Sequence, residues 1–297
     1  MDFHHPLFQS LALPLALSFA GAGLLRAGLG PVHGRRWASA GIGVAIVVGS
    51  IWILGWDMSP GTLTEELPWI YMAAALLGLG LEAMRAAPRT TWLATCALWT
   101  LVLAGLSDQS LTEQAVTWLV GVAVIAAVLG QSEESARAPA SLVVAGLGLA
   151  AVALINGSAL LFELSLSIAA AVAGCALWVW PTARIAFGAC GAVVSVIAWL
   201  ALAQGIALLS PVRPVVLLLL ACAFLSGPIV QWALSSDCPS TAAITATPTS
   251  HVTACTASGW SLNPPSTSVQ RAQVASQVVR GVARMASRPR PSKAAAI

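Results

Sequence analysis

The sequence predicts an all-α, polytopic transmembrane helical bundle with about nine spans, and its composition and hydropathy pattern are the reasons. Of the 297 residues, 58% are hydrophobic and only 8% are charged, whereas a soluble domain carries about 25% charged residues. A globule this apolar could not cover its own surface with polar groups, so its solvent must be lipid. The apolar residues also form continuous runs without the alternation of barrel strands, which favours helices.

The apolar runs set the number of spans. A helix needs about 20 apolar residues to cross a hydrocarbon core of ~30 Å. Nine runs approach this length and are predicted as spans: Leu7–Leu25, Trp37–Trp56, Pro68–Met84, Trp92–Leu106, Ala115–Gly130, Ala140–Ile155, Ser158–Trp180, Ile185–Leu209 and Val215–Leu234. No basic residue precedes the first run, so we expect a retained span there rather than a signal peptide. If Asn156-Gly157-Ser158 did not separate two spans, the count would be eight.

Basic residues between the predicted spans indicate the orientation, because cytoplasmic loops are rich in lysine and arginine. With nine spans, one side of the membrane holds Arg26, Arg35, Arg36, Arg85, Arg89, Arg137 and Arg184, and the other holds only Arg213. The first side is predicted to be the cytoplasm, which puts the N-terminus outside and the C-terminus inside. Arginine outnumbers lysine thirteen to one, which we take as a hint of a GC-rich genome and so of a bacterial inner membrane.

Tryptophan and small residues indicate how the spans pack. Most tryptophans lie near predicted span ends, where the ring can be buried and the N–H can find a partner. Trp99 and Trp199 lie in mid-span, and packing between helices is the simpler interpretation of both. Gly41, Ala45 and Gly49 share one helical face. Because close backbone approach holds helices together in lipid, we expect this face to pack within the chain rather than against a second copy.

The chain divides into residues 1–235, the transmembrane helical bundle, and residues 236–297, a cytoplasmic tail. The tail is rich in Ser, Thr, Ala and Pro and then basic, so it is expected to be disordered. An amphipathic helix over Gln270–Met285 on anionic lipid and a frameshifted end are the alternatives. Before the third span, Thr62 and Glu65 have the spacing of a capping box, which predicts a short interfacial helix outside the membrane.

Catalytic and cofactor signatures are missing from the sequence. The chain has no G-x-G-x-x-G, no Walker A motif, no H-E-x-x-H, no G-x-S-x-G and no C-x-x-C. The four histidines lie outside the predicted spans. We therefore expect no catalytic residues, no cofactor, no metal and no nucleic-acid partner. An intramembrane enzyme would need paired polar groups at one depth, and only Glu163 and Ser167 offer that pair.

Ionisable groups inside spans are the best functional signal here, because their burial in lipid is costly. Glu82 lies near the cytoplasmic end of the third span, and an ion pair with Arg85 three residues later would explain it. Glu163 lies about five residues inside the seventh span with no basic residue near it in sequence. Ser167 shares its helical face, and Asn156 and Gln204 are predicted at reachable depths. We predict these four residues as a binding site for a small solute or proton; a structural hydrogen bond or contact with outer headgroups is the alternative for Glu163.

The sequence supports competing hypotheses about the function of the chain. Permease-like movement of a small solute or proton would use Glu163, Asn156, Ser167 and Gln204. A non-catalytic membrane subunit or scaffold would instead use the small-residue faces and the tail to bind a membrane-protein partner. The lipid bilayer is the surrounding partner under both hypotheses. The buried acid favours the permease-like hypothesis.

Overall fold

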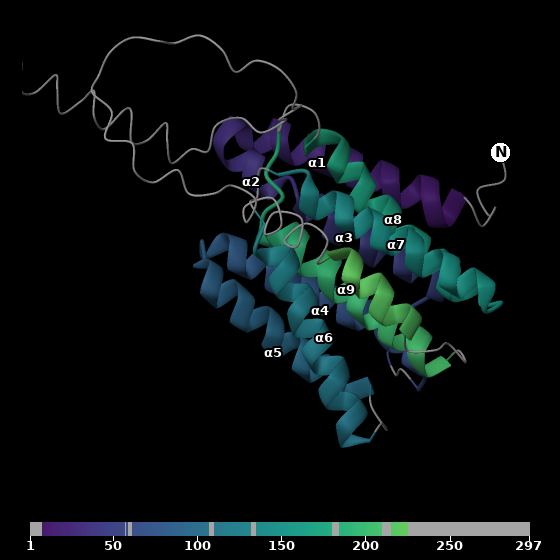
Figure 1. Ribbon diagram of the computed structural model, residues 1–297. Coiled ribbons are helices and arrows are strands. Elements are labelled where there is room, and N and C mark those ends of the chain that lie inside the picture. Colours follow the sequence, from purple (N-terminus) through teal and green to yellow (C-terminus); the bar gives the residue numbers. More distant parts are fainter. Residues whose placement is uncertain are drawn as a thin grey trace, which may run out of the picture. The chain divides into compact units, whose positions relative to one another are not determined.

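The computed structural model describes residues 8–56, 58, 61–106, 110–131, 135–179, 184–209 and 215–224, and over these residues it is 88% helix with no strand (Figure 1). The helices are the π-helix η1 (Phe8–Ala12), α1 (Leu13–Leu29), the π-helix η2 (Gly30–Gly34), α2 (Arg35–Trp37), α3 (Ala40–Leu54), α4 (Leu63–Ala83), α5 (Pro88–Leu106), α6 (Leu111–Leu129), α7 (Arg137–Ile155), α8 (Ala159–Val179), α9 (Ala189–Leu209) and the short helix Val215–Phe224. The predicted all-α class is confirmed for this part of the chain.

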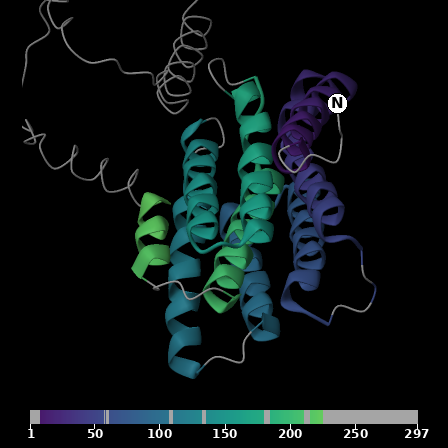
Figure 2. The same ribbon diagram turned by 90° about the vertical axis from the view of Figure 1, so that its right-hand side faces the viewer.

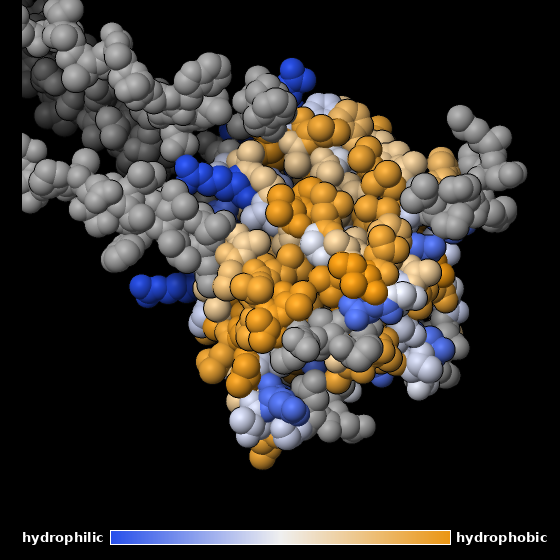
Figure 3. Space-filling view, turned by 45° about the vertical axis from the view of Figure 1, so that its right-hand side comes forward, coloured by the Kyte–Doolittle hydropathy of each residue, from blue (hydrophilic) through white to orange (hydrophobic). Residues whose placement is uncertain are grey.

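Several helices have the length and apolarity of membrane spans. Five meet both conditions: Phe8–Trp37, Leu111–Leu129, Arg137–Ile155, Ala159–Val179 and Ala189–Leu209. Ala40–Leu54 is apolar but shorter, and α4 and α5 fall outside both groups. Val215–Phe224 is the described part of the predicted span Val215–Leu234, whose remaining residues, 225–234, lie outside the described residues. Hydrophobic residues also cover most of the molecular face shown in Figure 3. The helices therefore indicate an integral membrane protein.

Helix α9 is the core of the bundle. In its most apolar window 83% of the residues are buried, compared with 22% for Phe8–Trp37. It contacts every helix from α3 to α8. A helix that is apolar on all sides can be buried on all sides, which is what the residues of α9 allow. The short helix Val215–Phe224, green in Figure 2, lies at one edge of the bundle, and the purple N-terminal helix lies at the other.

Glycine allows α1, α3 and α8 to approach one another closely. A Cβ added to Gly41 of α3 would lie 2.8 Å from the backbone nitrogen of Ala22 in α1. A Cβ added to Gly174 of α8 would lie 2.5 Å from the carbonyl oxygen of Leu15, also in α1. The face of Gly41, Ala45 and Gly49 thus packs within the chain, as the sequence predicted, because a larger side chain would separate the two backbones.

The break at Asn156-Gly157-Ser158 is a tight turn between two helices that pack side by side. Helix α7 ends with the N–H of Gly157 donating to Leu154 and the N–H of Ser158 donating to Ala153. This bond pair is a Schellman motif, and it requires a left-handed residue at its centre. Gly157 supplies it with φ +74°, a conformation that glycine adopts without strain. The prediction of two separate helices here is confirmed.

One prediction about a helix start needs correction. The capping residues Thr62 and Glu65 do not begin a separate interfacial helix; they begin α4, which continues through Pro68 to Ala83. The Glu65 carboxylate accepts hydrogen bonds from the backbone N–H groups of Gly61 and Thr62. Pro68 is tolerated because it lies near the start of the helix, where one lost backbone bond is followed by several intact turns.

The first helical stretch also extends further than predicted. Helix α1 continues past Leu25 to Leu29, and η2 and α2 follow it to Trp37. Arg26 therefore lies in the last turn of α1 rather than after it, where a cation is favoured by the helix dipole.

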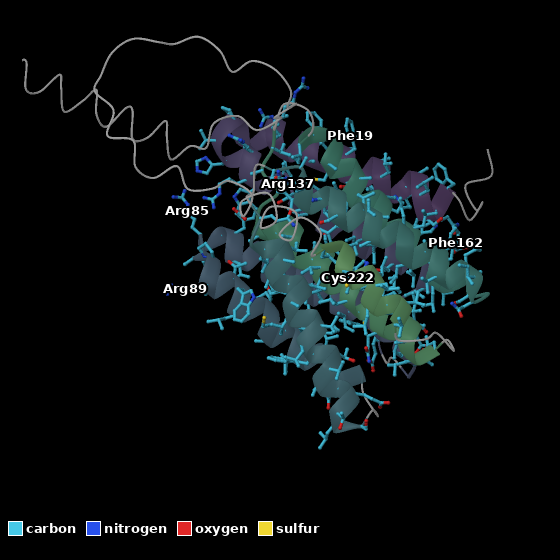
Figure 4. The ribbon with its side chains drawn as sticks, viewed as in Figure 1. Phe19, Arg85, Arg89, Arg137, Phe162 and Cys222 are labelled. Carbon is cyan, nitrogen blue, oxygen red and sulfur yellow. The ribbon has the colours of Figure 1, made fainter. Side chains whose placement is uncertain are left out.

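Apart from Arg184, which lies in the connection before α9, the arginines of the described residues lie at or next to helix ends. Figure 4 shows Arg85, Arg89 and Arg137 toward one end of the helices and Phe162 toward the other. Arg213 and the predicted tail from residue 236 to 297 lie outside the described residues.

Candidate functional site

Asn156 is engaged within its own helix. Its side-chain Nδ2 donates to the carbonyl oxygen of Val152 at 2.7 Å. The same carbonyl oxygen also accepts the backbone N–H of Asn156 at 3.1 Å, so Asn156 is bound twice to the last turn of α7. Asn156 thus stabilises the end of α7, and the structure gives it no bond to Glu163.

Ser167 and Glu163 lie one turn apart on α8 but in different surroundings. Ser167 is buried against α3, where a Cβ added to Gly49 would lie 2.7 Å from its Oγ. Glu163 is half-buried in the second turn of α8, next to Phe162, which Figure 4 places near the end of that helix. Within the described part of the chain, Glu163 takes part in no ion pair. Of the four predicted site residues, Glu163 has the side chain with the fewest interactions in the described part of the chain.

Gln204 lies elsewhere, in the wall of a cavity formed by α5, α6, α9 and the helix Val215–Phe224. The cavity has a volume of about 130 Å³ and is partly enclosed. Its wall is mostly apolar, with Val120, Leu200, Ala203 and Leu217 among the contributors. Asn156, Glu163 and Ser167 are not part of this wall. The structure therefore separates Gln204 from the three residues with which the sequence grouped it.

Three side chains of the cavity wall carry a buried nitrogen with no hydrogen-bond partner. Trp99 is 1% exposed, Trp199 is 2% exposed and Gln204 is 4% exposed. In the described part of the chain, neither indole Nε1 nor the Gln204 Nε2 has a partner. An unpaired buried donor costs about 1–3 kcal/mol, so most buried polar groups in native proteins are paired. Three such donors thus belong to the wall of one cavity, and chemically they could pair with a hydrogen-bond acceptor.

The two indoles are held by close contacts with neighbouring helices, and for Trp99 the contact is at the N–H edge of the ring. A Cβ added to Gly121 of α6 would lie 2.1 Å from the Nε1 of Trp99, so the absence of a side chain at position 121 makes room for this ring. Trp199 packs edge-on against Phe224 with 4.9 Å between the ring centroids. These contacts come from two helices, α6 and Val215–Phe224, and both belong to the cavity wall.

A second polar centre forms around Glu82 at the opposite end of the bundle. Its Oε1 lies 3.0 Å from the Nε of Arg36. Its Oε2 accepts a hydrogen bond from the backbone N–H of Ala189 at the start of α9. The predicted partner was Arg85, and that prediction is wrong. Arg85 is exposed and has φ +49°, because it is the left-handed residue of a Schellman turn that ends α4.

The sequence predicted one of the three donors in the cavity wall, Gln204, as a site residue. It did not identify Trp99 and Trp199 as donors. The signal that could have found them was the mid-span position of Trp99 and Trp199, away from the span ends where indoles find polar partners. Single-sequence reasoning could not show that both rings and Gln204 face the same cavity. For metals, the described residues contain no group of three His, Cys, Asp or Glu side chains close enough to hold an ion.

Comparisons with known proteins give no further guide. No protein-family model, no curated protein and no solved structure matches the chain. The functional argument therefore rests on the geometry of the cavity around Gln204.

Proposed function

We propose that this chain is a permease-like integral membrane protein that binds a small uncharged solute in the cavity between α5, α6, α9 and Val215–Phe224. The observation that carries the proposal is the group of three unpaired buried donors, Trp99, Trp199 and Gln204, in the wall of one cavity. Ligand sites are concave and mostly apolar, with a few convergent polar groups that orient the ligand. This cavity has that character.

The position of the cavity along the helices supports movement of a solute. Gln204 lies about a turn and a half before the end of α9, and Trp99 about two turns before the end of α5, so both lie roughly 8–10 Å inside those ends. A solute bound at this depth lies within the hydrocarbon region of the bilayer, which would otherwise exclude it. We propose that proton movement, if coupled to it, uses Glu163 of α8.

The proposal includes a topology. We propose nine spans in a bacterial inner membrane, with the N-terminus outside and the C-terminus in the cytoplasm. The arginines at the ends of α1, α4, α5 and α7 support it, because the positive-inside rule then puts their common end in the cytoplasm. In this topology the cavity lies toward the outer side of the membrane, where α9 ends and α6 begins.

Solute-induced swelling of proteoliposomes tests the proposed function. Purified protein is reconstituted, and vesicle swelling is followed by light scattering in urea, acetamide and glycerol. We expect faster swelling than in empty vesicles for at least one solute, and loss of this difference in Ala203→Phe, which fills the cavity. The matched control is Val44→Phe on the exposed face of α3, where Val44 is 56% exposed. Equal swelling of the wild type and Ala203→Phe would reject the cavity as the route.

A membrane subunit or scaffold is the second candidate function. Helix α6 favours it, because it carries large exposed apolar residues, with Leu119 60% exposed and Val116 51% exposed. A partner helix could cover this face as readily as lipid does. Stable co-purification of one membrane protein in mild detergent, lost on Leu119→Arg, would support this function over the permease-like one.

A further inference from the structure

We propose that the cavity between α5, α6, α9 and Val215–Phe224 selects an uncharged molecule with an apolar body and an oxygen acceptor, such as a ketone or ester carbonyl, that accepts hydrogen bonds from Trp99 and Trp199. This inference names the ligand class of the proposed permease-like site and therefore rests on that proposed function.

The two indoles determine that the ligand must be the hydrogen-bond acceptor. An indole Nε1–H can only donate, so a ligand that satisfies Trp99 or Trp199 must bring an acceptor. Gln204 can both donate and accept, and it adapts to whichever group the ligand presents next. A ligand rich in N–H groups and poor in acceptors would leave both indoles unpaired, which keeps their cost of about 1–3 kcal/mol each.

The rest of the wall decides charge and polarity. None of the residues that line the cavity is acidic or basic, and apolar side chains such as Val120, Leu200 and Leu217 form most of it. A charged ligand would lose its hydration here without gaining a counter-charge, which is far more costly than leaving a neutral polar group unpaired. The cavity thus disfavours ammonium ions and carboxylates and suits an uncharged ligand.

The volume decides the size. About 130 Å³ is slightly less than an apolar protein cavity of ~150 Å³ that holds benzene. A single small ring is therefore about the largest group that the cavity encloses. A longer molecule would extend through the open side.

Binding must also move the indole rings. The Nε1 atoms of Trp99 and Trp199 are buried, and that of Trp99 lies against Gly121, so each ring must rotate to present its N–H to a ligand. Such a rotation changes the surroundings of both rings. Tryptophan fluorescence should therefore report binding directly.

Three probes of nearly equal size separate the possible ligand classes. Cyclohexanone carries an acceptor, methylcyclohexane carries none, and cyclohexylammonium carries a charge. Each is titrated into the full-length protein in dodecyl maltoside, and tryptophan emission and the unfolding temperature are recorded. We expect cyclohexanone to act at a concentration on the order of tenfold lower than methylcyclohexane, because the hydrocarbon leaves the donors unpaired. Cyclohexylammonium should have no effect.

Variants assign the difference to the indoles. Trp199→Phe and Trp99→Phe should each reduce the preference for cyclohexanone over methylcyclohexane, since phenylalanine has no donor. Trp52→Phe on α3, where Trp52 is 55% exposed, is the matched control and should keep the wild-type preference. Ala203→Phe should remove the response to both molecules. If an indole variant does not fold, the concentrations at which the three probes act on the wild type still test the proposed ligand class.

The outcomes separate this inference from the proposed function. Equal responses to cyclohexanone and methylcyclohexane, both lost in Ala203→Phe, would overturn the acceptor class and leave small-molecule binding standing. No response to any probe, or responses that persist in Ala203→Phe, would overturn both.

Lipid is a second source of the same carbonyl chemistry. Diester and diether phosphatidylcholine are therefore added to the detergent-solubilised protein in parallel. If only the diester lipid shifts tryptophan emission and blocks cyclohexanone, a lipid carbonyl occupies the cavity. That result would support the acceptor class and overturn the permease-like function. Cyclohexanone binding that is unaffected by either lipid supports a free solute.

Discussion

Arg36 of α2 and Glu82 of α4 form an ion pair with 3.0 Å between Nε and Oε1, and their two side chains differ sharply in exposure. The Glu82 side chain is 3% exposed and the Arg36 side chain is 43% exposed. The carboxylate also accepts the N–H of Ala189, so this pair joins α2, α4 and the start of α9, the core helix. Breaking a buried pair from one side leaves an uncompensated charge, and only one of the two charges here is buried.

This asymmetry predicts that Arg36→Ala is more harmful than Glu82→Gln. Arg36→Ala leaves a buried carboxylate without its cation, and we expect a loss of about 1–3 kcal/mol in the free energy of unfolding. Glu82→Gln leaves a half-exposed guanidinium that can turn to water, so the loss should be smaller. The double variant should recover part of the loss of Arg36→Ala. Thermal unfolding in detergent ranks the three, and a greater loss for Glu82→Gln would contradict this account.

Gly121 is predicted to be required for the position of the Trp99 ring. In Gly121→Ala the new Cβ would lie 2.1 Å from the indole Nε1, so the ring must move, and we expect a loss of about 1–3 kcal/mol in stability. Gly80→Ala in α4 is the matched control, since a Cβ there meets nothing within 4 Å. It should be neutral or stabilise the protein by about 0.5–1 kcal/mol, because alanine favours the helix interior over glycine. Equal unfolding temperatures for the two variants would show that Trp99 is not held against α6.

Glu163 is predicted to be dispensable for folding. Asn156 bonds to Val152 and Gln204 lines a separate cavity, so leucine at position 163 strands neither of them. Glu163→Gln and Glu163→Leu should therefore both fold, and leucine should be neutral or stabilising, because an unpaired carboxyl in lipid is costly. Thermal unfolding of the two variants measures this. A loss of about 1–3 kcal/mol in both would mean that Glu163 holds helices together and is not available for proton movement.

The nine-span topology predicts a cytoplasmic C-terminus. A reporter fused after Ile297 should be active only in the cytoplasm, because an odd number of spans puts the two termini on opposite sides. Activity confined to the outside would instead require an even number. The matched control is a fusion after Leu209, the end of α9, which should report the outer side.

The sequence was sufficient for the elements whose cause is local. Apolar runs predict helices because lipid requires internally bonded backbone, and Gly157 predicts the turn between α7 and α8 because few residues adopt its φ. Thr62 and Glu65 also predict a helix start, although not that α4 continues from it.

Lateral contacts between helices could not be predicted, because every helix of such a bundle has several apolar faces and hydropathy does not choose among them. Arg85 is only three residues from Glu82 in the sequence. The ion-pair partner of Glu82 is nevertheless Arg36 of α2, and helix α3 lies between the two in the chain. Trp99, Trp199 and Gln204 meet for the same reason: α9 is surrounded, and which of its faces turns toward α5 and α6 is set by packing. The position of a residue along its helix was predictable from the sequence, and the grouping of side chains around the helix axis was not.

Access to the cavity from outside tests the central claim most directly. Thr117 of α6 lines the cavity, and Thr117→Cys is made in a chain whose native cysteines are replaced. We predict that methyl methanethiosulfonate, a small uncharged reagent, modifies this cysteine when added outside sealed vesicles, and that adding Ala203→Phe slows the reaction. Val44→Cys on the lipid-exposed face of α3 should stay unreactive, because a thiol in apolar surroundings forms little thiolate. Thr117→Cys reacting no faster than Val44→Cys, or reacting equally fast with and without Ala203→Phe, would contradict a binding cavity around Gln204.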